Sequence, residues 1–197
     1  RRNLTHVLGQ LTDRLPGCFL ADQQTVMWHP HAPLTIDVRD CADLLHAVAQ
    51  NSGPAPELQA RQLAQVVAQY QGEFLAGLTL SDSPEFELWL LRERERWRQQ
   101  IVTALDYLSS YQARQGNVRA AEAALRRWIE LEPWQEEAYR ALMRLLADHG
   151  RRAEALTYYE TCRRLLAEDL GITPTPETLA LRTDLMQAQA PMRAVEH

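Results

Sequence analysis

The stretch LSSYQARQGNVRAAEAAL (residues 108–125) returns in pattern as LMRLLADHGRRAEALTYY (residues 142–159). At a spacing of 34 residues the equivalent positions are Leu108, Gly116, Ala121 and Leu125 on one side and Leu142, Gly150, Ala155 and Tyr159 on the other. This period is typical of helix–turn–helix hairpins that stack side by side. Such hairpins carry out no chemistry of their own, and their stack presents a groove to a partner. The repeat therefore predicts a helical protein that works by binding.

The residue types at the equivalent positions fit the packing of tetratricopeptide-type hairpins. Ala121 and Ala155 are small enough for places where two helices cross closely, and Leu125 and Tyr159 are large enough to fill the neighbouring gap. Two such units are too few to be stable alone. The helices expected within residues 37–108 must therefore supply further stacking layers, although they lack the repeat pattern.

Composition supports a mainly α fold. The chain has 197 residues, is 46% hydrophobic and contains only 8 Gly, while Leu, Ala, Arg, Gln and Glu dominate. Its net charge of −5 argues against a chain coated in nucleic acid. All 21 basic residues are Arg. Because residues 1–35 carry more Arg than acid, any nucleic-acid contact is expected at the N-terminus.

Cysteine usage and hydropathy indicate a cytoplasmic protein. Cys18, Cys41 and Cys162 are odd in number and widely scattered, which suggests reduced thiols. No segment approaches the length of an apolar membrane span, and no secretory leader is recognisable. The chain begins with RRN in the middle of an amphipathic pattern, without Met, so further residues are expected upstream.

Apolar residues that recur at helical spacing predict most of the chain to be helical. The expected helices cover about 2–15, 37–50, 56–70, 84–115, 118–130, 134–149, 151–169 and 175–189. The runs 18–21 and 25–28 predict a β-hairpin, and residues 29–33 a linker. Ser83 is expected to cap the longest helix, with Pro84 at its first position. Residues 191–197 are expected to fray.

Several short motifs, in their order and spacing, resemble a known family. They are RNL at 2–4 with Leu8 and Leu11, FLAD at 19–22 with QTV at 24–26, APL at 32–34 with DV at 37–38, YQGEFL at 70–75 with GL at 77–78, FELWL at 86–90 with the run 92–98, and DLGI at 169–172 with PTPET at 174–178. The chain resembles the bacterial transcriptional activator domain of the Streptomyces antibiotic regulatory protein type. In that family an OmpR-like winged helix precedes a tetratricopeptide-like helical domain.

The resemblance implies a domain boundary and a set of DNA contacts. Residues 1–33 would be the end of the winged helix, with its recognition helix and wing, and residues 34–197 the activator domain. The implied DNA contacts are Arg1, Arg2, Asn3, His6, Gln10, Gln23 and Gln24. Recognition helices of this type tend to be rich in Arg, and the wing usually offers an Arg where this chain has Gln. We therefore expect this chain alone to bind DNA weakly and without sequence preference.

Arginines also stud the repeat helices and the long helix before them. An arginine-lined groove could hold a carboxylate-bearing peptide, and the candidates for it are Arg94, Arg140, Arg144 and Arg163. The alternative is a solvated face whose arginines pair with neighbouring acids. Arg94 falls within an apolar stripe, where it could pair internally.

No catalytic, metal or cofactor site is predicted. The sequence has no Gly-rich phosphate loop, no GxSxG elbow and no HExxH motif. The spacing of His29, His31 and Cys18 matches no closed zinc pattern. Cys162 aligns with Trp128 in the repeat, which predicts a buried thiol rather than a nucleophile.

Four of the tryptophans occupy helix positions that favour burial. They are Trp89, Trp97, Trp128 and Trp134. Aromatic rings can also stack on nucleic-acid bases. Core packing is the expectation for these four, because large rings at such positions usually fill the interior.

Two functions stay open at this point. In the first, the chain is part of a transcriptional activator: the winged helix contacts promoter DNA, and the helical domain contacts the transcription machinery, a regulatory protein module or a second protomer. In the second, it is a tetratricopeptide-type peptide-binding adaptor with no role at DNA. The helix and hairpin before His29 discriminate between them, since an adaptor has no need of these elements.

Overall fold

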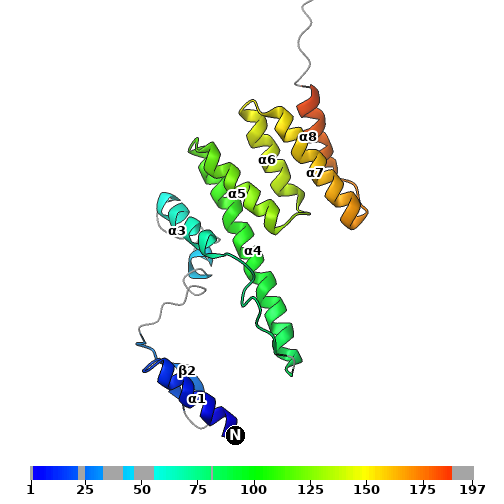
Figure 1. Ribbon diagram of the computed structural model, residues 1–197. Coiled ribbons are helices and arrows are strands. Elements are labelled where there is room, and N and C mark those ends of the chain that lie inside the picture. Colours follow the sequence, from blue (N-terminus) through cyan, green and yellow to red (C-terminus); the bar gives the residue numbers. More distant parts are fainter. Residues whose placement is uncertain (1, 22–24, 33–41, 47–55, 81, 188–197) are drawn as a thin grey trace, which may run out of the picture. The chain divides into compact units, whose positions relative to one another are not determined.

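The computed structural model describes residues 2–21, 25–32, 42–46, 56–80 and 82–187 (Figure 1). The chain divides into two compact units, Arg1–Asp43 and Leu44–His197. The described part is mainly helical with one small antiparallel sheet, which confirms the predicted fold class. The predicted boundary after residue 33 and the predicted frayed tail lie outside the described residues.

The N-terminal unit consists of a helix followed by a hairpin. Helix α1 (Arg2–Arg14) leads through a turn at Gly17 into β1 (Phe19–Ala21) and β2 (Val26–Trp28). The strands pair antiparallel with Phe19 opposite Trp28, and the two rings stack with their centroids 4.5 Å apart. This cross-strand aromatic pair stabilises a hairpin that is short in itself.

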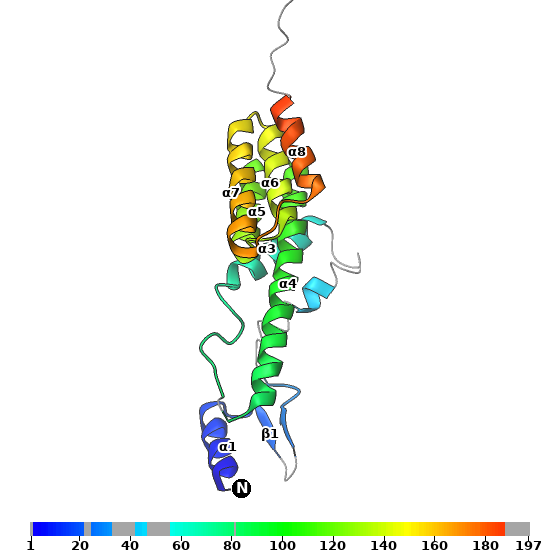
Figure 2. The same ribbon diagram turned by 90° about the vertical axis from the view of Figure 1, so that its right-hand side faces the viewer.

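The second unit is a stack of helices. Its labelled helices are α3 (Pro56–Gln69), α4 (Pro84–Arg114), α5 (Val118–Leu131), α6 (Glu136–Asp148), α7 (Arg152–Leu170) and α8 (Pro176–Gln187). Each helix from α3 to α8 packs against the next one in the chain, and α8 also contacts α6 (Figures 1 and 2). Residues 42–46, which span the division between the two units in the sequence, are helical as well, while the rest of the helix expected over 37–50 lies outside the described residues.

Two equivalent bends close the hairpins α4–α5 and α6–α7. Gly116 and Gly150 have φ angles of +73° and +76°, a left-handed conformation that favours glycine. At the first bend the amide of Asn117 donates to the carbonyl of Gln112, and at the second the amide of Arg151 donates to the carbonyl of Leu146. This six-residue closure is the Schellman motif. The bends thus lie at matching places in neighbouring hairpins, as the repeat predicts.

The core of the stack follows the repeat. Ala121 and Ala155 are fully buried, and Leu125 and Tyr159 are each only 3% exposed. A cluster of Tyr139, Cys162 and Leu166 fills the interior of the α6–α7 hairpin. Large side chains beside small ones let the helices approach closely without voids.

The predictions for the tryptophans are half right. Trp97 and Trp128 are buried, as expected, but Trp89 and Trp134 are 44% and 47% exposed. Trp134 lies in the turn between α5 and α6, where its indole N–H donates to the Asp169 carboxylate over 3.0 Å. A tryptophan with a partner for its N–H is stable at a half-open position, because its ring does not need full burial.

The start of α4 is as predicted in sequence position but not in side-chain chemistry. Ser83 is the N-cap residue and Pro84 the first helical residue. The Ser83 side chain makes no capping hydrogen bond, and its backbone carbonyl accepts from the amides of Phe86 and Glu87 instead. The fixed φ of Pro84 and the two glutamates of the first turn support the helix start in place of the hydroxyl.

Candidate protein-contact and nucleic-acid surfaces

Only two of the seven residues implied as DNA contacts have a described side chain. His6 and Gln10 lie one turn apart on α1, both are exposed, and the Gln10 amide nitrogen is 3.1 Å from His6 Nε2. Arg2 and Asn3 lie in the first turn of α1, and the remaining three, Arg1, Gln23 and Gln24, are outside the described residues. The described polar face of α1 thus offers an imidazole and an amide, groups that can hydrogen-bond to bases or phosphates.

The opposite face of α1 is apolar and open. Val7, Leu11 and Leu15 are 37–47% exposed. An amphipathic helix of this kind packs its apolar stripe on other elements of its domain.

Arg94 is bonded to its own chain. Its Nε donates to the carbonyl of Phe74 over 3.0 Å, and its Nη2 donates to the carbonyl of Leu75 over 3.1 Å. Its Nη1 also lies 3.5 Å from the Glu73 carboxylate. Of the two roles open to Arg94, the internal pairing is the one for which the structure shows contacts. Arg94 fastens the loop before α4 to the side of that helix.

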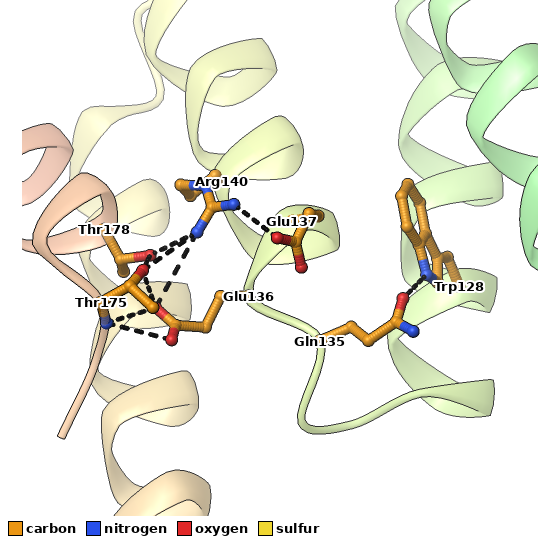
Figure 3. Close-up of polar contacts among 7 residues, drawn as sticks. All are labelled: Trp128, Gln135, Glu136, Glu137, Arg140, Thr175 and Thr178. Atoms are coloured by element: carbon orange, nitrogen blue, oxygen red, sulfur yellow. Dashed lines mark hydrogen bonds and ion pairs between the residues drawn. The ribbon is translucent and has the colours of Figure 1, made fainter. Parts of the chain in front are cut away.

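Arg140 joins a polar network between α6 and α8 (Figure 3). Its Nη1 donates to Thr178 Oγ1 over 3.0 Å and its Nη2 to Glu137 over 2.8 Å. The nearby Glu136 carboxylate accepts from the amide and the hydroxyl of Thr175, over 3.0 and 2.9 Å. Because Thr178 is fully buried, this network fixes the start of α8 against α6.

A second contact shown in Figure 3 supports the turn before α6. The indole N–H of Trp128 donates to Gln135 Oε1 over 2.9 Å. Gln135 is the N-cap residue of α6, and its side chain makes no capping bond. The buried tryptophan therefore holds the entry to the second hairpin.

Arg144 and Arg163 are the two groove candidates that stay open to solvent. Arg144 is exposed one turn after Arg140 on α6 and takes part in no ion pair among the described residues. Arg163 on α7 pairs with Glu160 over 2.8 Å, and both side chains are about half exposed. Exposed pairs of this kind contribute little to stability, so these arginines can exchange their partners at low cost.

An ion cluster links the two hairpins. The Glu122 carboxylate on α5 accepts from Arg126 on the same helix and, over 2.6 Å, from Arg151 at the start of α7. Arg151 also pairs with Glu154. The hydrogen bonds from Arg151 and Arg126 hold the pKa of Glu122 below its ordinary value. The cluster joins α5 to the start of α7.

Five exposed leucines lie on the first half of α4 and on the loop before it. They are Leu75, Leu78, Leu80, Leu88 and Leu91, with exposed fractions of 41–61%. We call them the leucine surface. Sequence reasoning missed this surface, although the run LWLL at 88–91 carries a signal. Four successive apolar residues point around more than one face of a helix, so one packed side cannot cover them all.

Two titratable groups of the core, Cys162 and Tyr139, have raised pKa values. Burial raises the pKa of the Cys162 thiol to about 12, and it also raises the pKa of Tyr139 to about 12. Cys162 is therefore a protonated core residue, as predicted. Among the residues that the structure describes, no three metal-ligating side chains converge. None of the described helices could cross a membrane.

Comparison with known proteins identifies relatives of the chain. Residues 36–186 match the family model of the bacterial transcriptional activator domain. The regulatory protein AfsR of Streptomyces coelicolor is 30% identical over 175 residues, and that of Streptomyces griseus is 31% identical over 157 residues. These matches cover 88% and 78% of this chain, which spans only 17% and 15% of the two relatives.

A solved structure shows the same fold. Mycobacterium tuberculosis EmbR, determined in complex with a low-affinity phosphopeptide, superimposes with a TM-score of 0.65 at 20% sequence identity. The similarity covers 97% of this chain and 51% of EmbR. The arrangement of helices described above therefore occurs within a longer protein.

Proposed function

The chain belongs to the bacterial transcriptional activator domain family, and from that premise we propose that it is part of a transcriptional activator whose helical unit binds a protein partner. The observation that supports this most is the extent of the family match. It ends at residue 186, within the last turn of α8, and it takes in every labelled helix of the stack. The activator domain and the hairpin stack are the same part of the chain, so the function belongs to the surface of the stack.

The N-terminal unit is proposed to contact promoter DNA. A helix followed by a hairpin is the order in which a winged helix ends, and the exposed polar face of α1 would enter a groove. An adaptor has no need of these elements, so their presence favours the regulator over the adaptor. Because α1 contains only two Arg, few phosphates would be neutralised, and DNA binding would be weak and only modestly dependent on salt.

The helical unit is proposed to act by recruitment. Arg144 and Arg163 are the candidates for gripping acidic groups of the transcription machinery, of a regulatory module or of a second protomer. The likeness to AfsR, which is named a regulatory protein, supports this role. Bacterial promoters lie in the cytoplasm, where we expect the protein to act.

A tethering experiment tests the proposal. The full chain is fused to an unrelated DNA-binding protein whose site lies upstream of a reporter gene in a bacterial cell. Expression above that of the DNA-binding protein alone is expected, with a loss of most of the gain in the Arg144→Glu/Arg163→Glu variant. Arg119→Glu, an exposed change on α5, serves as the matched control. No gain from the full chain would refute the recruitment role.

A salt-titrated binding measurement tests the DNA role. The full chain is expected to bind a random-sequence duplex weakly, and its affinity is expected to fall as salt rises. Nanomolar, sequence-specific binding by this chain would contradict the weak binding predicted from its poorly charged recognition face.

A further inference from the structure

We propose that the leucine surface is the docking site for a basic amphipathic helix of the partner protein. This inference rests on the recruitment role proposed above and names the surface and the chemistry of the partner. The five leucines lie on the first half of α4 and on the loop that runs along it. Monomeric proteins rarely leave so many large apolar side chains together in water, and such groups mark interaction sites.

The loop is fastened to α4 at both ends. At one end Arg94 holds the carbonyls of Phe74 and Leu75. At the other end the Glu87 side chain accepts from the amide of Leu80. The leucines between these points are therefore displayed from a fixed backbone, which lowers the entropy lost when a partner binds.

Leu75 is held in a strained conformation with its side chain open to water. Its φ angle of +49° is the only positive value for a non-glycine residue in the described part of the chain. This left-handed conformation costs a leucine about 1–2 kcal/mol. The side chain is 41% exposed, so core packing does not account for a leucine at a place where glycine would be more stable. Strain retained at an exposed apolar residue points to binding.

The charge around the leucines identifies the partner. Residues 72–91 contain four acidic residues, Glu73, Asp82, Glu85 and Glu87, and no basic residue. The next basic residues are Arg92 and Arg94, and Arg94 is already bonded to the loop and paired with Glu73. Asp82, Glu85 and Glu87 take part in no ion pair among the described residues, so they are the acids left to attract a partner. A second copy using the same surface would place acid against acid, because a two-fold contact pairs a patch with itself. A helix with leucine-type anchors and Lys or Arg at its flanks complements this surface.

Two synthetic peptides test the inference. Both are 16-residue helices with the same leucine positions; one carries Lys at its polar positions and the other Glu. Isothermal titration calorimetry with the full chain is expected to show binding of the Lys peptide at least about ten-fold tighter than that of the Glu peptide. Equal affinities would overturn the choice of a basic partner.

Matched variants separate a specific surface from general attraction between opposite charges. Leu88→Ser/Leu91→Ser leaves every charge in place and should weaken the Lys peptide about ten-fold or more. Leu179→Ser, at a leucine on α8 that is 41% exposed, should leave binding unchanged. If both variants bind like the original chain, the leucine surface is not the site.

Leu75→Gly provides a second test if Leu88→Ser/Leu91→Ser fails to fold. The change should preserve or raise the melting temperature, because it relieves the positive φ, while it weakens the Lys peptide. A lowered melting temperature would make Leu75 a structural residue and overturn its proposed role. A dimer in sedimentation equilibrium that Leu88→Ser/Leu91→Ser abolishes would assign the surface to a second copy instead.

The peptide and reporter experiments fail independently. If the tethered chain activates the reporter but the Lys peptide does not bind at the leucines, recruitment stands and this docking site is wrong. If the peptide binds there but no reporter gain occurs, the docking site stands and the recruitment role is wrong.

Discussion

The hairpins α4–α5 and α6–α7 share the same bend, yet their first helices are covered to very different extents. Helix α6 buries Tyr139, Leu142 and Leu146 completely, and its first turn is fastened to α8. Helix α4 is more than twice as long; its second half buries Ile101, Leu105 and Leu108, while its first half leaves Leu88 and Leu91 exposed. The repeat thus specifies the bend and the helix packing. The first half of α4 has no counterpart in α6, so the repeat does not specify its packing. Residues free of the packing requirement are available for binding.

Replacing leucines on the two helices tests this contrast with the largest expected effect. Leu142→Ala removes a fully buried side chain and should lower the free energy of unfolding by about 2–5 kcal/mol. Leu91→Ala, at a side chain that is 61% exposed, should cost less than about 0.5 kcal/mol. Urea denaturation of both variants measures the difference. A large loss in Leu91→Ala would mean that the first half of α4 is structural after all.

The second hairpin is bonded to the start of α8 through Glu136 and Thr175, and Glu136→Gln tests the strength of that contact. The amide keeps one acceptor for Thr175 but removes the charge, which should cost about 2 kcal/mol. Hydrogen exchange should rise in α8 before it rises in α6. Glu137→Gln is the matched control, because Glu137 pairs with Arg140, which also lies near Glu136, but is 61% exposed. This control change should lower the free energy of unfolding by less than about 1 kcal/mol. Equal hydrogen-exchange rates in α8 of the two variants would show that Glu136 does not hold α8 in place.

The bends themselves should respond alike. Gly116→Ala and Gly150→Ala introduce a side chain at positive φ, and the added carbon would meet no atom within 4 Å at either position. Only the backbone conformation is penalised, so each change should cost about 1–2 kcal/mol. Thermal or urea unfolding of the two variants provides the comparison. A clear difference between the two losses would show that the bends are not equivalent.

The smallest effect is expected from the charge cluster between the hairpins. The folded pKa of Glu122 lies below its unfolded value, so its stabilising contribution is present above the ordinary glutamate pKa and is lost as pH falls through the folded pKa. The stability difference between the wild type and Glu122→Gln should therefore shrink from pH 7 towards pH 3. Urea midpoints at a series of pH values measure this. A difference that stays constant with pH would assign the contribution of Glu122 to packing.

Sequence periodicity predicted the hairpin stack because its signal lies in local packing. Gly116 and Gly150 mark the bends, and Ala121 and Ala155 are buried at the equivalent positions of the two hairpins. The burial of Cys162 followed from its alignment with Trp128. Each of these positions has an equivalent 34 residues away in the other hairpin, which is why a sequence pattern could place it.

Positions that depend on contacts between distant segments were not predictable in this way. Arg140 looked like a surface residue of its helix, but residues 35 and 38 positions later accept its hydrogen bonds. Trp89 and Trp134 had the pattern of core residues, and nothing in the sequence showed that each indole ring would stay about half exposed. Arg94 was placed within an apolar stripe, yet the loop carbonyls it holds could be identified only from the structure.

The equality of the two bends also makes the segment 117–150 a unit of duplication. The segment begins just after Gly116 and ends at Gly150, so the same bend conformation lies at both of its ends. A second copy of residues 117–150 inserted after Gly150 would add one pair of helices between α4 and α8, and it would need no new type of bend. The protein could thus be lengthened as a spacer, with its two end surfaces moved apart by a fixed step and neither one redesigned.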